Sequence, residues 1–212
     1  MALYDVKPRF RALLRGMMPA LQAIHPDWIT LWGLLCSLLA AALFQTAEAD
    51  RWPFLVIPVL LLLRIVFNAL DGMVAQATGK ARAFGEVLNE MTDRLSDLSI
   101  LLGIAVSSLS SLPWGVAAAV LVLLSSYAGL LGKAVGAGRQ YGGILGKADR
   151  MLYLGLVCLA AFFVGNPIVM ASGPVSLRLF DLLLAAFAVL ALLTTAQRVA
   201  SIHRALSHPG RA

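Results

Sequence analysis

Residues 64–97 read RIVFNALDGMVAQATGKARAFGEVLNEMTDRLSD, and they combine two apolar segments with an unusual number of polar residues. Its first part continues an apolar run that begins near Trp52, and it includes Arg64, Asn68 and Asp71. After a polar turn at 79–82, further polar residues recur through the next apolar segment: Glu86, Asn89, Glu90, Asp93 and Asp97. An ionisable residue inside a membrane span costs about 2.5 to 3.5 kcal/mol, so spans that keep several of them indicate a functional site.

The rest of the chain is apolar enough for a membrane to be its main solvent. Of the 212 residues, 60% are hydrophobic and 13% are charged, and the mean hydropathy is +0.85. A helix needs about 20 residues to cross a hydrocarbon core of about 30 Å. We therefore expect an all-α membrane protein with six transmembrane helices in a single domain, residues 1–212. The expected spans cover about 28–46, 52–78, 83–109, 113–132, 147–165 and 175–198, with Asp27 as the N-cap of the first.

The distribution of charge predicts how the chain crosses the membrane. Lys and Arg gather in the N-terminal segment, in the second and fourth loops and in the tail, whereas the opposite loops hold only Arg51 and Arg178. By the positive-inside rule, both termini are expected to be cytoplasmic. We expect a multi-pass protein of the cytoplasmic (inner) membrane if the source is a bacterium. The net charge of +6 is spread over short loops, so no nucleic-acid partner is expected.

Residues 1–25 are expected to form an amphipathic juxtamembrane helix. Phe10, Leu13, Leu14, Met17 and Leu21 recur at helical spacing, and the basic residues lie off that face. Two interpretations remain open. The apolar face lies on an anionic membrane surface, or it packs against the bundle.

The polar residues of the second and third spans are expected to face one another. At 100° per residue, those of each span share one helix face. Because a short loop joins the two spans, Asp71 and Asp93 should lie at a similar depth, about 10 to 15 Å from the cytoplasmic end. Carboxylates that converge there repel unless a cation lies between them. Oxygen ligands without His or Cys suit Mg²⁺ or Mn²⁺, which substrate phosphates commonly complete, so the pattern predicts phosphoryl chemistry.

A purely structural interpretation is that these acids pair with Arg64, Arg82 and Arg94 and hold the helices together. Five acidic residues against one deeply placed arginine make this the less favoured interpretation for the group as a whole. It is the preferred one for Asp97, because Arg64 should lie at nearly the same depth. We therefore predict an ion pair between Arg64 and Asp97.

This stretch resembles the signature of the CDP-alcohol phosphatidyltransferase family, D-x2-D-G-x2-A-R, eight residues, then G-x3-D-x3-D. The matching run is Asn68-x2-Asp71-Gly72-x2-Ala75-Gln76, eight residues, then Gly85-x3-Asn89-x3-Asp93. The spacing is intact, and the position across the second and third of six spans is also similar to the family. Three residues depart from the pattern: Asn68 and Asn89 replace aspartates, and Gln76 replaces the arginine.

The resemblance implies that a CDP-linked lipid, CDP-diacylglycerol in most members, donates its phosphatidyl group to an alcohol acceptor and releases CMP in phospholipid biosynthesis. It implies that Asp71 and Asp93 bind metal, that Asn68 and Asn89 are weaker ligands, and that Asp93 takes the proton of the attacking hydroxyl. Glu86, Glu90 or Asp97 would make up the negative charge that the two asparagines lack, and Glu90 is a further candidate metal ligand. Otherwise fewer metal ions bind, or activity is altered or lost.

The remaining site residues follow from the same resemblance. It implies close approach of the nucleotide to Gly72, Ala75, Gln76 and Gly85, although close helix packing explains the small residues equally well. Basic groups near the cytoplasmic face, Lys147 and Arg150 in particular, are candidates to bind an acceptor or its phosphate, or else ordinary contacts to lipid headgroups. The resemblance also implies a homodimer.

Two other classes of function were weighed against this enzyme. A membrane transporter also places acids in its spans, but it predicts polar residues across several helices and some repeat symmetry, and the sequence shows neither. A catalytically altered or inactive relative would bind the CDP-lipid or a partner without turnover, and the two asparagines keep that alternative open.

Overall fold

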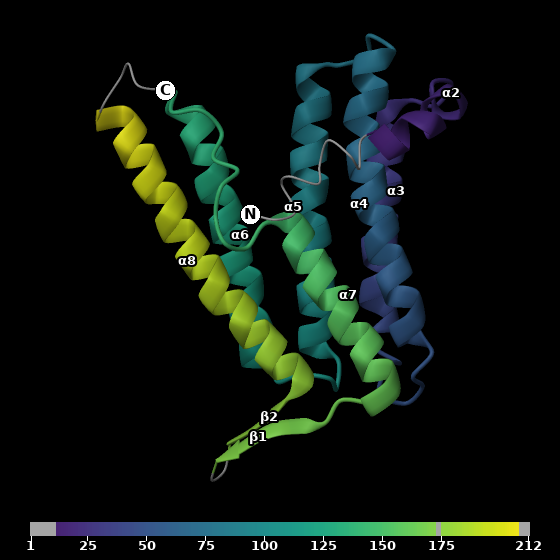
Figure 1. Ribbon diagram of the computed structural model, residues 1–212, viewed down its shortest axis with the longest axis vertical. Helices are drawn as coiled ribbons and strands as arrows, with labels where there is room; N and C mark the ends of the chain where they lie inside the picture. The colour runs from purple at the N-terminus through teal and green to yellow at the C-terminus, as the bar shows by residue number, and fades with distance from the viewer. Residues whose placement is uncertain (1–11, 173–174, 208–212) are drawn as a thin grey trace.

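The computed structural model describes residues 12–172 and 175–207, and helices dominate it. An antiparallel bundle contains six long helices (Figure 1): α3 (Pro26–Leu43), α4 (Pro53–Ala77), α5 (Ala83–Val106), α6 (Leu112–Ala134), α7 (Lys147–Val164) and α8 (Leu179–Ser207). A 3-10 turn, η1 (Arg15–Met17), and a short helix, α2 (Met18–Leu21), precede the bundle. A hairpin of two strands, β1 (Ile168–Ser172) and β2 (Val175–Arg178), joins α7 to α8.

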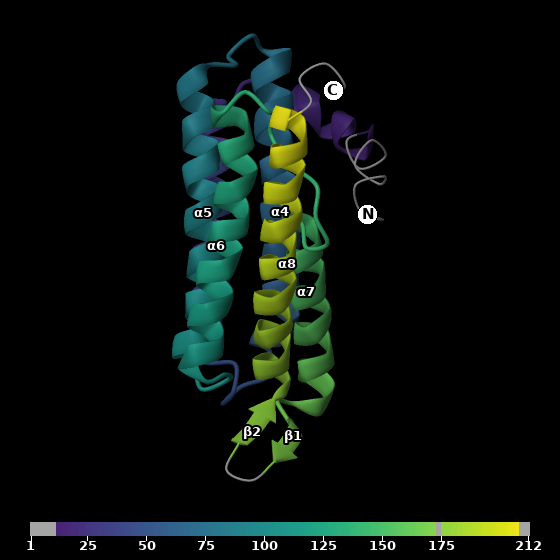
Figure 2. The same cartoon turned by 90° about the vertical axis from the view of Figure 1, so that its left-hand side faces the viewer.

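Four of the described helices, α3, α4, α6 and α8, are long and apolar enough to cross a membrane. The chain is therefore an integral membrane protein. The helices α5 and α7 have 24 and 18 residues and carry most of the charged groups of the site, so six spans remain a prediction. The start of α3, the end of α8 and the loop at 78–82 lie at one end of the bundle, and the hairpin lies at the other (Figures 1 and 2).

Proline marks the start of three of the six long helices. Pro26, Pro53 and Pro113 occupy the first or second helical position, where the missing N–H has no intrahelical partner to lose. Because α3 begins at Pro26, its N-cap is His25, whose Nδ1 accepts a hydrogen bond from the backbone N–H of Asp27 at 3.4 Å. The expectation that Asp27 is the cap was wrong. The expected break at 110–113 is confirmed by the start of α6.

The connection before the last helix differs from the prediction. A helix was expected from about 175, whereas β1 and β2 pair there as an antiparallel hairpin and the helix begins at Leu179. The buried carboxylate of Asp181 accepts hydrogen bonds from the backbone N–H groups of Arg178 at 3.0 Å and Ser111 at 2.7 Å. Asp181 thus fixes the start of α8 and ties it to the start of α6. The fold is mostly helical with one small hairpin, rather than all-α.

The segment before α3 packs on the bundle over part of its length. Leu14 is only 4% exposed and contacts Ile29, Leu70 and Val74, whereas Leu13 is 76% exposed. This arrangement favours packing for the inner part of the segment. Phe10 and the rest of residues 1–11 lie outside the described residues, and contact with a membrane surface stays a prediction.

The closest approach between α5 and α6 is made by a glycine. A Cβ added at Gly115 would lie 2.2 Å from the Cβ of Ala105. We expect Gly115→Ala to push the two helices apart and to lower the free energy of unfolding by about 1 to 3 kcal/mol, the usual cost of overpacking. The measurement is the midpoint of thermal unfolding in detergent micelles.

Gly72→Ala is the matched control, because Gly72 also lies within a long helix, α4, and a Cβ there meets nothing within 4 Å. Both variants gain the same intrinsic helix propensity, so a difference in midpoint reports the contact. Equal midpoints for the two variants would contradict the close approach.

Candidate functional site

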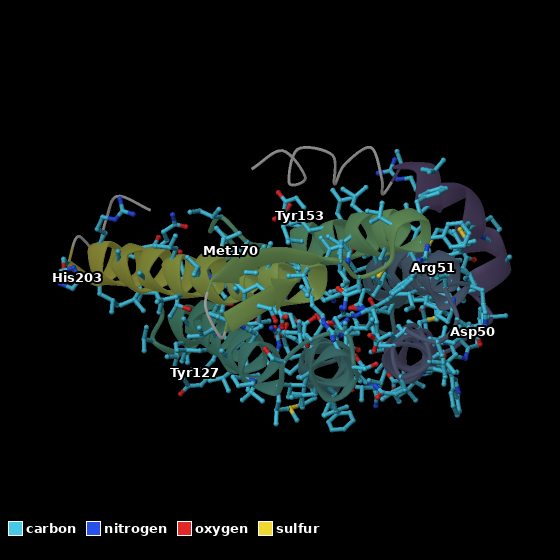
Figure 3. The ribbon with its side chains drawn as sticks, turned by 90° about the horizontal axis from the view of Figure 1, so that it is seen from below. Asp50, Arg51, Tyr127, Tyr153, Met170 and His203 are labelled. Carbon is cyan, nitrogen blue, oxygen red and sulfur yellow. The ribbon has the colours of Figure 1, made fainter. Side chains whose placement is uncertain are left out.

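Polar side chains from four helices are joined by hydrogen bonds inside the bundle. Viewed along the bundle, nitrogen and oxygen atoms gather among the helices, whereas a residue such as Tyr127, 56% exposed, points outward from α6 (Figure 3). We divide these side chains into three groups. The Asp71 group contains Thr30, Asp71 and Asn89; the Lys147 group contains Asn68, Asp93 and Lys147; and the Asp97 triad contains Arg64, Asp97 and Arg150.

The Asp71 group holds a buried carboxylate without an ion pair. Asp71 is 4% exposed, and its Oδ2 accepts hydrogen bonds from Thr30 Oγ1 at 2.8 Å and Asn89 Nδ2 at 2.6 Å. Its Oδ1 accepts one from the backbone N–H of Gly72 at 2.5 Å. Of the acidic residues in α4 and α5, Asp71 alone forms no salt bridge with a described residue. A buried negative charge without a partner is costly, which makes Asp71 the strongest candidate for a bound cation.

The Lys147 group brings a lysine from α7 onto the signature residues of α4 and α5. Lys147 Nζ donates hydrogen bonds to Asn68 Oδ1 at 2.5 Å and to Asp93 Oδ1. It therefore lies between the first and the last positions of the signature. The other oxygen of Asp93, Oδ2, accepts no hydrogen bond from the residues that the structure describes.

The loop at 135–146 positions Lys147 at the start of α7. The backbone N–H of Leu145 donates to Thr194 Oγ1 at 3.1 Å, and that of Ile144 donates to Gln197 Oε1 at 3.2 Å, so α8 holds the end of the loop. The N–H of Gly146 donates to Asp149 Oδ2 at 2.9 Å and caps α7. Lys147 is the first residue of that helix.

The Asp97 triad contains the predicted ion pair and one more arginine. Arg64 Nη2 lies 2.6 Å from Asp97 Oδ1, and Arg150 Nη2 lies 2.5 Å from Asp97 Oδ2. All three residues are buried, and the Nε atoms of both arginines find no hydrogen-bond partner among the described residues. Two guanidinium groups share one carboxylate, so the triad carries a net positive charge. Arg150 was expected at an acceptor or phosphate, and the structure places it against Asp97.

The glutamates lie outside these three groups. Glu90 Oε2 lies 3.0 Å from Arg94 Nη2, and Glu90 Oε1 pairs with Arg139. Glu86 pairs with Lys133 at an exposed position. The structural interpretation thus describes Glu86, Glu90 and Asp97 well, since each has a basic partner on its own or another element. Both Glu90 oxygens face arginines rather than Asp71.

The signature glycines border open space rather than another helix. A Cβ added at Gly72 would meet nothing within 4 Å, and one at Gly85 would meet only Arg82 Cγ at 3.5 Å. Helix packing therefore does not explain these two glycines. Gln76 is exposed and Ala75 is partly buried on the same stretch of α4.

The ligand set for metal is smaller than the family signature implies. Among the described residues, no three His, Cys, Asp or Glu side chains come together as a metal site. Asn68 and Asn89 supply neutral amide oxygens at most, and Asp93 already faces Lys147. Sequence reasoning also missed Thr30, because its bond to Asp71 depends on how α3 crosses α4 and no motif marks it.

The Asp97 triad makes an asymmetric prediction about stability. Asp97→Leu leaves two buried arginines without a carboxylate, whereas Arg64→Met leaves Asp97 paired with Arg150. We expect Asp97→Leu to lose about 3 to 5 kcal/mol of unfolding free energy and Arg64→Met to lose clearly less. Thermal unfolding of both single variants and the double variant in micelles measures this. Costs that simply add in the double variant would show that the two side chains are not coupled.

Comparisons with known proteins identify the family of this chain. The chain is 36% identical over 162 residues to the inner membrane protein YnbA of Escherichia coli (strain K12), covering 76% of this chain and 80% of that protein. It is 31% identical over 161 residues to an archaetidylinositol phosphate synthase of Pyrococcus horikoshii, covering 74% and 82%.

Solved structures share the fold. The phosphatidylinositol phosphate synthase PgsA1 of Mycobacterium tuberculosis, solved with CDP-DAG bound, superposes with a TM-score of 0.66 at 22% identity, covering 96% of this chain and 94% of that one. Its structure with manganese and citrate gives a TM-score of 0.65 at 23% identity, covering 96% and 90%. A family model described as CDP-alcohol phosphatidyltransferase matches residues 23–197, which include the whole signature. Because this match spans most of the sequence, the chain belongs to the CDP-alcohol phosphatidyltransferase family.

Proposed function

We propose that this chain transfers the substituted phosphate group of a CDP-linked lipid, with CDP-diacylglycerol as the first candidate, to an alcohol, and releases CMP. The observation that carries the proposal is the buried Asp71, whose charge no described side chain neutralises. The family signature around it keeps its full spacing. Relatives are named as synthases of phosphatidylinositol phosphate and archaetidylinositol phosphate, and the proposed reaction is of the same class as such syntheses.

Asp71 is the residue that would hold a divalent cation. Its carboxylate supplies charge, and the hydroxyl oxygen of Thr30 already lies beside it. Asn89 faces Asp71 with its amide nitrogen, so a turn of that amide group would bring its oxygen to a bound cation. Such ligands suit Mg²⁺ or Mn²⁺, and manganese is bound in one PgsA1 structure. A bound divalent cation would offset the negative charge of the diphosphate and of the departing CMP.

Asp93 is the residue that we propose accepts a proton. In the proposed reaction the acceptor oxygen forms a bond to the phosphorus that carries the lipid, and the bond from that phosphorus to the bridging oxygen breaks as CMP leaves. The proton of the attacking hydroxyl must go to a base. Asp93 Oδ2 is available for it, because Lys147 holds only Oδ1.

The nucleotide is proposed to lie along the open side of the signature. The space beside Gly72 lets a ligand approach the backbone of α4, and an alanine there would intrude on it. Gly85 borders similar space at the start of α5. Because this end of the bundle carries the loops rich in Lys and Arg, we place it on the cytoplasmic side of a membrane that six helices span, the inner membrane if the source is a bacterium. A homodimer is proposed from the family resemblance.

An anionic acceptor fits the excess of positive charge. Arg94 and Arg139 share Glu90 in the same way that the two arginines of the triad share Asp97. Among the described residues, Arg198 on α8 donates hydrogen bonds only to carbonyl oxygens, those of Gly142 at 2.9 Å and Ser125 at 2.6 Å. An acceptor that carries a phosphate would supply the missing negative charge.

Release of CMP from CDP-diacylglycerol by the purified protein tests the function. We expect turnover with Mg²⁺ or Mn²⁺ and an acceptor. Asp93→Asn should lose about 100-fold or more, the range for removing a general base. Asp71→Asn should also lose most of the activity, because it removes the charged ligand of the cation. Asp50→Asn, an exposed aspartate in the loop at the hairpin end, is the matched control and should keep full activity. Turnover that resists chelators and both site substitutions would refute the mechanism, and no turnover with any acceptor would favour a relative that only binds.

A second assay separates acceptors by charge. We expect phosphorylated alcohols to be used at least about 10-fold more efficiently than the same alcohols without phosphate, since a hydrogen bond between charged groups contributes about 1.5 to 3 kcal/mol. Arg198→Gln should raise KM for the phosphorylated acceptor and leave KM for the CDP-lipid unchanged. Arg204→Gln, near the end of the same helix, is the control. Equal rates with both acceptor types would contradict the assignment of an anionic acceptor.

A further inference from the structure

We propose that the ammonium group of Lys147 takes the place of a divalent cation between residues 68 and 93, so that the site holds no more than one divalent ion per chain. The inference rests on the proposed function, because it assigns the cations of the same site. It adds a built-in positive charge to a signature that has lost two negative ones.

The charge of the signature sets the first constraint. The family pattern has four aspartates, whereas this chain keeps Asp71 and Asp93 and has Asn68 and Asn89 at the other positions. With Lys147 included, two aspartates and one lysine leave a single net negative charge. One divalent cation changes this charge from −1 to +1, an excess that the negative diphosphate of the substrate would offset. Two such cations would leave a large positive excess among apolar helices, which is costly.

The contacts of Lys147 set the second constraint. Its Nζ donates to both Asn68 Oδ1 and Asp93 Oδ1, the first and last ligand positions of the signature. A metal ion that used these two oxygens as ligands would lie about 2.0 to 2.2 Å from each, in the space that the ammonium group fills. Lysine and metal therefore exclude one another at this position.

The anchoring of Lys147 argues that the contact is built rather than incidental. Hydrogen bonds to Thr194 and Gln197 of α8 hold the loop that precedes Lys147. The N-cap of α7 is Gly146, whose N–H donates to Asp149. The lysine thus extends from a fixed point, and only part of its side chain is exposed. Arg150, one turn later on α7, contacts Asp97, one turn after Asp93 on α5, so two cations of α7 match two carboxylates of α5.

Asn89 also fits a site that binds fewer metal ions. It offers Asp71 an N–H donor at a position where the family signature has a carboxylate. Asn89 Nδ2 donates to Asp71 Oδ2 at 2.6 Å. An aspartate at position 89 would bring two carboxylates together and would require a cation between them. The amide makes that contact without one. Residue 89 therefore still contacts Asp71, but the contact no longer requires a metal ion.

Counting bound Mn²⁺ tests the inference without relying on activity. Purified full-length protein is titrated with Mn²⁺ and the free ion is followed by electron paramagnetic resonance, which also shows coupling between two ions about 4 Å apart. We expect the wild-type chain to bind one uncoupled ion. Restoring both aspartates with Asn68→Asp and Asn89→Asp should still give one, because Lys147 remains in place. Adding Lys147→Met to those two changes should give two coupled ions.

Lys133→Met in the same double-aspartate background is the matched control, because Lys133 pairs with exposed Glu86, which lies outside the Asp71 and Lys147 groups. It should leave the count at one. Two ions in the wild type, or in the double-aspartate variant with Lys147 intact, would overturn the inference. So would a count of one after Lys147→Met in a variant whose thermal unfolding shows that it is folded.

The counts and the CMP assay fail independently. A wild-type chain that binds one ion, gains the second only when Lys147 is replaced, and never releases CMP would keep the inference and reject the proposed function. A chain that releases CMP and binds two ions would do the reverse.

Discussion

The cost of placing charge among apolar helices is the constraint on which this structure depends. Arg64, a large and completely buried side chain, is tolerated because it pairs with Asp97, a carboxylate that it shares with Arg150. Its Nη2 also donates to the backbone oxygen of Asp93 at 3.3 Å, and its Nη1 contacts Met151 Sδ at 2.8 Å. One side chain of α4 therefore fixes both α5 and α7. The signature carboxylates have defined positions because this pairing sets the relation of the three helices.

The same constraint explains which acids are available for chemistry. Glu86, Glu90 and Asp97 have basic partners, and these ion pairs hold helices and loops together. Asp71 has only hydrogen-bond donors that are neutral. The division follows the membrane environment, where an acid must be paired, must accept hydrogen bonds, or must bind a cation. Asp71 is held by hydrogen bonds alone, and Asp93 pairs with Lys147 through Oδ1 while its Oδ2 accepts no hydrogen bond from a described residue.

The sequence was sufficient for features that depend on local pattern. Proline and glycine marked most helix ends, and helical spacing placed Arg64 and Asp97 at matching depth. It was insufficient where contacts depend on the path of a loop. The loop at 135–146 carries Lys147 onto Asn68, and no periodicity in either segment shows that meeting. The hairpin at 168–178 was also missed, because a short apolar stretch does not distinguish a strand from the start of a helix.

The loop at 135–146 also has a mechanical consequence. Two hydrogen bonds join the end of the loop to α8. By contrast, α7 packs mainly on α4, and α8 packs mainly on α6. Lys147 therefore marks a joint between two helix pairs. If α8 leans away from α7, the loop is drawn with it, and the ammonium group is withdrawn from Asp93. Through this loop, the position of α8 relative to α7 is coupled to the charge that Asp93 meets inside the bundle.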